Sequence, residues 1–264
     1  MTRNEPSELL AVANAAIDGV EESFRAGLGA APAHFKGQGD FATEVDLAIE
    51  KRLCSLLTES TGIPVVGEED TSGKVPAGET PQTVWVVDPV DGTANFSAGN
   101  PLCGILIALI DGGKPLVAAA SFPLLQRRLS ATAAGDFEST GGPAAGFGGG
   151  EDSYGFEESR GHVGCSTHLP TDLFANLRRT GLRPRMTGSV GLDSAFVAQG
   201  VFDGAINFSP HPWDNAAGAL FARAAGGCAT DPDGNEWTLG ARGLVVGTRQ
   251  VHGTILDAVA RLKD

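Results

Sequence analysis

One stretch decides the fold: Trp85-Val86-Val87-Asp88-Pro89-Val90-Asp91-Gly92-Thr93-Ala94-Asn95-Phe96. Residues 83–87 are all β-branched or aromatic, which predicts a buried strand. The strand leads into two carboxylates three residues apart, then a glycine and a hydroxyl. Rigidly spaced carboxylates suit hard cations such as Mg²⁺, and backbone N–H groups at a helix start suit phosphate. The stretch therefore predicts metal-assisted phosphate chemistry.

Composition limits the partners of the chain. Its 264 residues, 42% of them hydrophobic, are enough for one large domain or two fused halves. A net charge of −13 argues against nucleic acid or an anionic membrane as a partner. The same charge means that a phosphate-handling site needs bound cations to reverse the local field.

Cysteine usage and the absence of apolar segments predict a cytoplasmic protein. No C-x-x-C pair occurs, so the cysteines are expected to be buried thiols in a reducing compartment and not a disulfide framework or a zinc site. The N-terminus lacks a signal-like apolar region, and no apolar run approaches membrane-spanning length. The four cysteines are Cys54, Cys103, Cys165 and Cys228.

Hydrophobic periodicity outlines the elements between these motifs. Helices are predicted at residues 7–24 (with Ser7 as the N-cap), 43–61, 170–178, 190–199, 213–225 and 251–262. Strands are predicted at 63–66, 83–87, 103–111, 115–122, 129–133, 162–165, 185–187, 204–208 and 244–246. Residues 30–40 and the glycine-rich residues 135–158 are expected to be loops. An antiparallel-rich first half followed by a βα half predicts a layered mixed α/β protein.

Four acidic clusters carry the candidate chemistry. Each has an ordinary structural explanation: a capping box, a solvated acidic turn, a proline turn and an acid at a helix N-terminus. Their joint occurrence favours function, because buried carboxylates without partners cost several kcal/mol each and must converge on cations or lie in water. The clusters are Thr43-x-x-Asp46, Gly67-Glu68-Glu69, Asp88-x-x-Asp91-Gly92-Thr93 and Trp213-Asp214-x-Ala216-Ala217-Gly218.

These clusters resemble the signature of the inositol monophosphatase family, which are Mg²⁺-dependent, lithium-sensitive phosphomonoesterases. With residues 39–50 included, the chain looks most like actinobacterial inositol-1-monophosphatases, and the resemblance covers nearly the whole chain. It implies a layered α-β-α-β-α sandwich of the sugar-phosphatase type and a homodimer. The expected organisation is a single unit with a metal-binding half (1–134), a mobile loop (135–160) and an α/β half with the alcohol pocket (161–264).

The resemblance also implies residue roles for two to three Mg²⁺ ions, with Mn²⁺ as a substitute. Glu68, Asp88 and the Val90 carbonyl would hold the first ion, and Asp88, Asp91 and Asp214 the second, with a weaker third ion near Glu68. Thr93, held by Asp46, would join Glu68 in activating the attacking water. Phosphate would bind the N–H groups of Gly92 and Thr93, while Gly188, Ser189, Asn207, Asp91 and Asp214 would face the substrate.

Three residues that are not predicted metal ligands have roles that the sequence leaves open. Asn207 stands seven positions before Asp214, where the animal enzymes carry an acidic residue that binds a ring hydroxyl. An amide can still hydrogen-bond a polyol, but without charge. His211 could line the site, although packing or a surface position is favoured, and Lys36 could reach the metal site from its loop.

The most favoured reaction is hydrolysis of myo-inositol 1-phosphate by a metal-activated water. The same chemistry could act on fructose 1,6-bisphosphate, histidinol phosphate or 3′-phosphoadenosine 5′-phosphate. Outside that chemistry, the protein could be a non-catalytic metal or phosphate sensor, or a carbohydrate-binding module with structural acidic turns.

Overall fold

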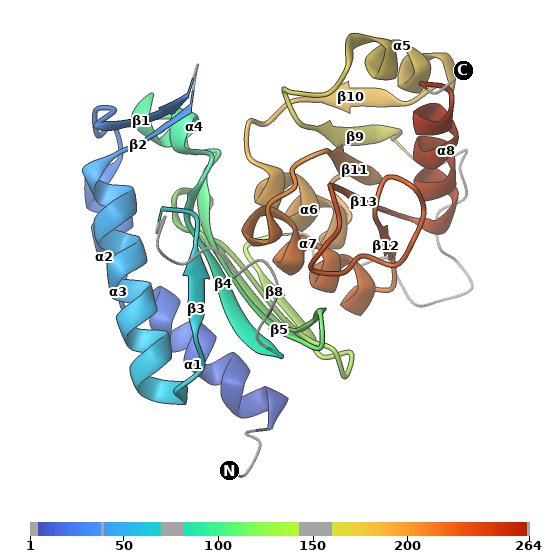
Figure 1. Cartoon of the computed structure of the whole chain (residues 1–264). Helices are drawn as coiled ribbons and strands as arrows, with labels where there is room; N and C mark the ends of the chain where they lie inside the picture. Colours follow the sequence, from blue (N-terminus) through green and yellow to red (C-terminus); the bar gives the residue numbers. More distant parts are fainter. Residues whose placement is uncertain (1–4, 38–39, 70–81, 143–159, 263–264) are drawn as a thin grey trace.

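Two large β-sheets alternate with three layers of helices, and β1 (His34–Gly37) and β2 (Asp40–Ala42) form a separate two-stranded sheet (Figure 1). The computed structural model describes residues 5–37, 40–69, 82–142 and 160–262. From one side to the other, the order is helices, a six-stranded sheet, helices, a five-stranded sheet and helices. The predicted layered α-β-α-β-α sandwich is therefore confirmed.

The six-stranded sheet has the order β3-β4-β5-β6-β7-β8. Its strands are antiparallel except for the parallel pair β3 and β4. The central strands are buried along almost their whole length, as expected for a sheet covered on both faces. The strands are β3 (Val65–Gly67), β4 (Thr83–Asp91), β5 (Gly104–Asp111), β6 (Lys114–Phe122), β7 (Arg127–Thr132) and β8 (Phe137–Thr140).

The five-stranded sheet has the order β10-β9-β11-β13-β12. Strand β9 pairs in parallel with β10 and β11, and β13 runs antiparallel to β11 and β12. The strands are β9 (His162–Cys165), β10 (Arg183–Arg185), β11 (Gly204–Asn207), β12 (Cys228–Thr230) and β13 (Leu244–Gly247).

Helices α6 and α7 form the middle layer, where α7 packs against strands of both sheets. Helices α1 and α3 cover the outer face of the six-stranded sheet, and α5 and α8 lie beyond the other sheet (Figure 1). The helices are α1 (Pro6–Asp18), α2 (Glu21–Gly27), α3 (Glu44–Thr61), α4 (Thr93–Ser97), α5 (Thr171–Arg179), α6 (Val190–Ala198), α7 (Pro212–Ala224) and α8 (Arg249–Ala260), with a 3₁₀ turn at Pro123–Leu125.

The largest core cluster spans the middle layer. It joins Val86 and Leu106 of the first sheet to Leu192 of α6, Phe221 of α7 and Val246 of the second sheet. The two halves of the chain therefore share this cluster, and each half has a further cluster of its own.

The N-terminal helix differs from the prediction. The expected helix at residues 7–24 is broken into α1 and α2, with Gly19 as the C-cap of α1. A Cβ at Gly19 would lie 3.0 Å from Leu56 Cδ1, so a glycine permits close packing of α1 on α3. The N-cap is Glu5 and not Ser7, because Pro6 takes the first helical position.

Two predicted loops contain strands. Residues 30–40 include β1 (His34–Gly37), which pairs with β2 (Asp40–Ala42). All of β1 is exposed, so it has no buried face to produce apolar alternation. The predicted mobile loop at 135–160 is wrong for residues 137–140, which form the edge strand β8, and residues 143–159 lie outside the described residues. Strand β10 begins two residues before the predicted strand at 185–187.

None of the described helices is both long enough and apolar enough to cross a membrane.

Candidate active site

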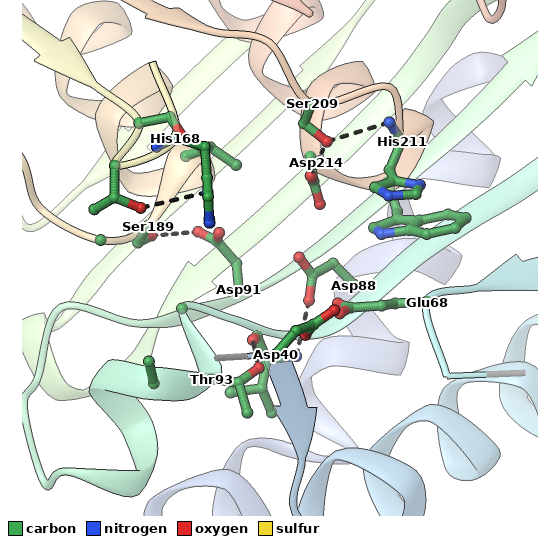
Figure 2. A pocket seen from close by; sticks show the side chains of 18 of the residues that line it. Asp40, Glu68, Asp88, Asp91, Thr93, His168, Ser189, Ser209, His211 and Asp214 are labelled. Carbon is green, nitrogen blue, oxygen red and sulfur yellow. Dashed lines mark hydrogen bonds between the residues drawn. The ribbon is translucent and has the colours of Figure 1, made fainter. Parts of the chain in front are cut away.

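A cavity of about 820 Å³ opens where the end of β4 faces the starts of α6 and α7. Residues from both halves of the chain line it, including Glu68, Asp88, Asp91 and Asp214 (Figure 2). The sequence-predicted residues that line it are Lys36, Glu68, Asp88, Val90, Asp91, Gly92, Thr93, Gly188, Ser189, His211 and Asp214.

The end of β4 presents the first two carboxylates. The pairing of β4 with β5 is irregular between Asp88 and Asp91, where β4 carries one extra residue. Asp88 is buried, and its Oδ1 accepts a hydrogen bond from the Val90 N–H at 3.0 Å. Burial raises the pKa of Asp88, and repulsion by Glu68, Asp91 and Asp214 raises it further.

Groups at the start of α6 donate hydrogen bonds to Asp91, the last residue of β4. Its Oδ2 accepts hydrogen bonds from the Ser189 hydroxyl, from Gly191 N at 3.0 Å and from Leu192 N at 3.3 Å. Burial raises the pKa of Asp91 to about 6 even though these bonds lower it. The contact joins the two halves directly at the cavity.

Gly92 cannot be replaced by a larger residue without strain. Its φ is +84°, and a Cβ there would lie 3.0 Å from Leu102 O and 3.2 Å from both Gly188 O and Ser189 Cβ. The glycine therefore lets the turn after β4 approach the Gly188-Ser189 turn.

The capping box predicted at Thr43 and Asp46 is present, and it also orients the site. Thr43 N donates to Asp46 Oδ2 at 3.1 Å, and the Thr43 hydroxyl bonds the same oxygen. The other carboxylate oxygen, Oδ1, lies 3.1 Å from Thr93 Oγ1, which is also 3.0 Å from Val90 O. Burial raises the pKa of Asp46, while the Thr43 and Thr93 bonds lower it.

Lys36 reaches the acidic turn after β3. Its Nζ donates to Glu68 Oε1 and to Glu69 Oε1, each at 2.8 Å. Burial lowers the pKa of Lys36, but the attraction of Glu68 and the hydrogen bonds to Glu68 and Glu69 outweigh it, so the pKa is raised overall. Burial raises the pKa of Glu69 to about 7 against the Lys36 hydrogen bond.

Asp214 enters from the first turn of α7. The Ser209 hydroxyl donates to its Oδ2, and burial raises its pKa to about 8 against that bond. His211 also lines the cavity, and its ring stacks on Trp213 with centroids 4.8 Å apart and planes 11° apart. The sequence analysis favoured a packing or surface position for His211. The structure shows that the ring packs on Trp213 and that the residue also lines the cavity.

The structure does not bring Asn207 to this cavity. Its side-chain Nδ2 donates to Asn215 Oδ1 at 2.9 Å, and its Oδ1 accepts from Ser209 N at 2.9 Å. Asn207 is buried and lines a separate, smaller pocket, so its side chain is not part of the cavity wall and its contact with the substrate remains a prediction. Its amide supports the loop that carries Ser209, the partner of Asp214.

We expect Asn207→Ala to lower activity on all phosphate esters in equal proportion and to lower Tm. The change leaves Asn215 Oδ1 without this donor and Ser209 N without its acceptor, at a cost of about 1–3 kcal/mol for a buried unsatisfied group. Parallel thermal melts and kcat/KM values on two unlike esters check this. A selective loss on polyol phosphates would return Asn207 to the alcohol pocket.

Sequence reasoning missed two supporting residues. Ser209 holds Asp214, and Glu50 of α3 accepts the Glu69 N–H at 2.8 Å. A Cβ at Gly67 would lie within 2.2–2.5 Å of the Glu50 carboxyl group, so the glycine of the Gly67-Glu68-Glu69 turn makes room for it. Gly67 was the feature of the sequence that could have indicated a buried group packed against this turn.

The donor set fits hard cations. Every candidate ligand is an oxygen, and Asp91 Oδ1 and Asp214 Oδ1 have no hydrogen-bond donor among the described residues. Repulsion among these buried carboxylates is what a cation would relieve. Among the described residues, no three His, Cys, Asp or Glu side chains are arranged so that they could hold a metal ion as they stand.

Comparison with solved structures agrees with the fold. The extragenic suppressor protein suhB of Bartonella henselae superposes with a TM-score of 0.79 at 23% identity, covering 96% of this chain and 98% of that one. This likeness defines the architecture as that of a known layered α/β sandwich.

The sequence comparisons define the family. The model of the inositol monophosphatase family matches residues 5–264, and the chain belongs to that family. Inositol-1-monophosphatase ImpA of Mycolicibacterium smegmatis is 39% identical, over 95% of this chain and 91% of its own length. A fructose-1,6-bisphosphatase/inositol-1-monophosphatase of Aquifex aeolicus is 28% identical, over 86% of this chain and 84% of its own. The chain is a phosphatase of a metal-dependent family.

Proposed function

We propose that the protein hydrolyses small phosphorylated polyols, with myo-inositol 1-phosphate as the main substrate, in a Mg²⁺-dependent reaction. The observation that carries this proposal is the meeting of Glu68, Asp88, Asp91 and Asp214 from both halves around one cavity. The similarity to the inositol-1-monophosphatase of M. smegmatis supports the substrate.

Two to three Mg²⁺ ions, or Mn²⁺ in their place, would be held by the buried oxygen ligands. Glu68, Asp88 and the Val90 carbonyl form one set, and Asp88, Asp91 and Asp214 the other, with a further ion near Glu68. Bound ions would lower the pKa of water, neutralise the phosphoryl oxygens and stabilise the leaving alkoxide.

Thr93, Asp46 and Glu68 position the attacking water. The Thr93 hydroxyl has one proton and two acceptors in reach, Asp46 Oδ1 and Val90 O. Donation to Asp46 leaves the Thr93 oxygen free to accept a hydrogen bond from water, and Glu68 supplies a carboxylate on the same cavity wall. Phosphoryl transfer depends on positioning and charge stabilisation, so no covalent nucleophile is required.

The substrate lies between the two halves in this proposal. Gly92 and Thr93 offer N–H groups at the start of α4. The first N–H groups of a helix have no acceptor within the helix, so they can bind phosphate oxygens. Gly188 and Ser189 form the facing wall toward the alcohol, although the Ser189 hydroxyl is engaged by Asp91.

The metal-free protein should lose stability as pH rises from about 4 to about 8. Ordinary aspartates titrate near 3.8, whereas burial raises the native pKa of Asp91 to about 6 and of Asp214 to about 8. Between these values the native state binds more protons than the unfolded chain, so the free energy of unfolding falls with rising pH.

Mg²⁺ should oppose this loss, because it binds the ionised carboxylates. The Mg²⁺-induced rise in Tm is expected to be larger near pH 8 than near pH 5. Thermal melts with Mg²⁺ or EDTA at both pH values measure it, with Asp214→Asn as the matched variant that should respond less. A Tm indifferent to Mg²⁺ near pH 8 would contradict metal binding at these carboxylates.

Phosphate release tests the proposed function. We expect myo-inositol 1-phosphate to be hydrolysed with Mg²⁺ and not in excess EDTA, and to be preferred over fructose 1,6-bisphosphate, histidinol phosphate and 3′-phosphoadenosine 5′-phosphate. A preference for fructose 1,6-bisphosphate would favour the fructose-1,6-bisphosphatase activity named for the A. aeolicus relative. Mg²⁺ binding without turnover of any ester would instead indicate a sensor.

We also propose that the protein is a cytoplasmic homodimer that binds neither nucleic acid nor membranes. The net charge of −13 and the four free cysteines support the location and the excluded partners. Light scattering of the purified chain would measure the mass.

A further inference from the structure

Asp193 is a buried carboxylate in the cavity wall that the proposed reaction does not use. It lies on α6, is 3% exposed, and faces the same cavity as Asp91 and Asp214. Its Oδ1 accepts a hydrogen bond from the Thr187 hydroxyl at 2.8 Å. A buried acid with one partner needs an explanation, because burying a carboxylate is costly.

The second oxygen of Asp193 is open. No hydrogen-bond donor in the described ranges reaches Oδ2. Among the described side chains, two polar atoms are fully buried and lack a hydrogen-bond partner, Arg128 Nε and Trp237 Nε1. Asp193 Oδ2 is not one of them. The oxygen is therefore not sealed off, and Asp193 lines the large cavity as well as a small pocket beside it.

Strand β9 is shaped around this side chain. A Cβ at Gly164 would lie 2.6 Å from Asp193 Cγ and 2.9 Å from its Oδ1, so only glycine leaves room for the carboxyl group. Directly after β9, residues 166–168 line the same cavity. Asp193 and the end of β9 thus belong to one wall, on the side of the second half of the chain.

Asp193 lies next to Asn207, the position at which the animal enzymes carry an acidic residue. It lines the small pocket that Asn207 also lines, on the adjoining element. Asn207 is tied to Asn215 and Ser209, and it carries no charge. A carboxylate on α6 can therefore supply the acceptor that β11 lacks.

The chemistry of Asp193 limits its ligand. A carboxylate repels a phosphoryl group, but it accepts a strong hydrogen bond from a neutral hydroxyl. We propose that Asp193 is a specificity-determining residue that accepts a hydrogen bond from a ring hydroxyl of the alcohol part of the substrate. This inference rests on the proposed function, since it names the residue that distinguishes polyols within the same site.

The test compares two substrates that differ only in ring hydroxyls, myo-inositol 1-phosphate and cyclohexyl phosphate. The measured quantity is the ratio of their kcat/KM values with Mg²⁺. Asp193→Ala should reduce this ratio roughly 10- to 100-fold, the range for a lost hydrogen bond to a charged group, with the loss mainly in KM. Asp193→Asn, which keeps the shape and a polar atom, should reduce it less.

Two controls separate recognition from folding. Asn176→Ala removes a buried amide that donates to Ala258 O of α8 at 3.2 Å, and neither residue lines the cavity. It should lower Tm and leave the ratio unchanged. Asn207→Ala should also leave the ratio unchanged.

The outcomes are distinguishable. If the wild-type enzyme shows no preference for the hydroxylated ring, the proposed substrate class fails, and this inference fails with it. If the wild-type enzyme prefers inositol 1-phosphate but both Asp193 variants keep the full ratio, the proposed function stands and the role of Asp193 is overturned. Should Asp193→Ala not fold, the Asp193→Asn ratio alone decides.

Discussion

Asp88→Asn is expected to abolish turnover of every phosphate ester while the fold stays intact. Asp88 is buried at the end of β4, and Glu68, Asp91 and Asp214 all raise its pKa by repulsion. In the proposed site Asp88 would be a ligand of two ions, so the loss should exceed the roughly 10³-fold found when a single oxyanion donor is removed. Asparagine has nearly the same shape and removes one of the repelling charges, so the metal-free protein should be no less stable.

The measurements are kcat with saturating Mg²⁺ and the thermal melt with EDTA. Asp203→Asn is the matched control: Asp203 accepts the His162 N–H at 2.8 Å, away from the cavity-lining residues, and asparagine keeps an acceptor oxygen there, so turnover should persist. Activity of Asp88→Asn within tenfold of the wild type, or full wild-type activity in EDTA, would reject the metal-ligand role.

Thr93→Ala should lower kcat by roughly two to four orders of magnitude, the range for losing general-base positioning. Thr93 Oγ1 lies between Asp46 Oδ1 and Val90 O, and no other described hydroxyl contacts Asp46 at Oδ1. Thr93→Ser keeps the hydroxyl and should keep most of the activity.

Steady-state kinetics of the two Thr93 variants measures the effect. KM should change far less than kcat, because the hydroxyl acts on the water and not on the alcohol. Trapping a phosphothreonine at residue 93 would show instead that Thr93 is a covalent nucleophile.

Local sequence predicted the parts of the site that depend on neighbours in the chain. The β-prone run before Asp88 predicted β4, although β4 continues to Asp91 through the acidic turn. The Thr43 and Asp46 spacing predicted the capping box that is present. Both signals are short in range. The layered fold, which the order of strands and helices and the family resemblance predicted, is confirmed.

Contacts between distant segments could not be predicted from such short-range signals. Asn207 looked like a substrate ligand from its spacing to Asp214, but its amide is held by Asn215 and Ser209. The depth of Asp193 depends on Gly164, a glycine in another element. The exposed strand β1 offered no buried face to detect. In each case the deciding fact is what packs against the residue.

The shared core around α6 and α7 bears on how the molecule unfolds. Because Phe221 packs in the same cluster as Leu106 of one sheet and Val246 of the other, separating the sheets would expose that cluster to water. Denaturation should therefore be a single cooperative transition in which both sheets melt together. A destabilising change on either side would then be felt across the whole chain, and neither half should persist as an independently folded fragment.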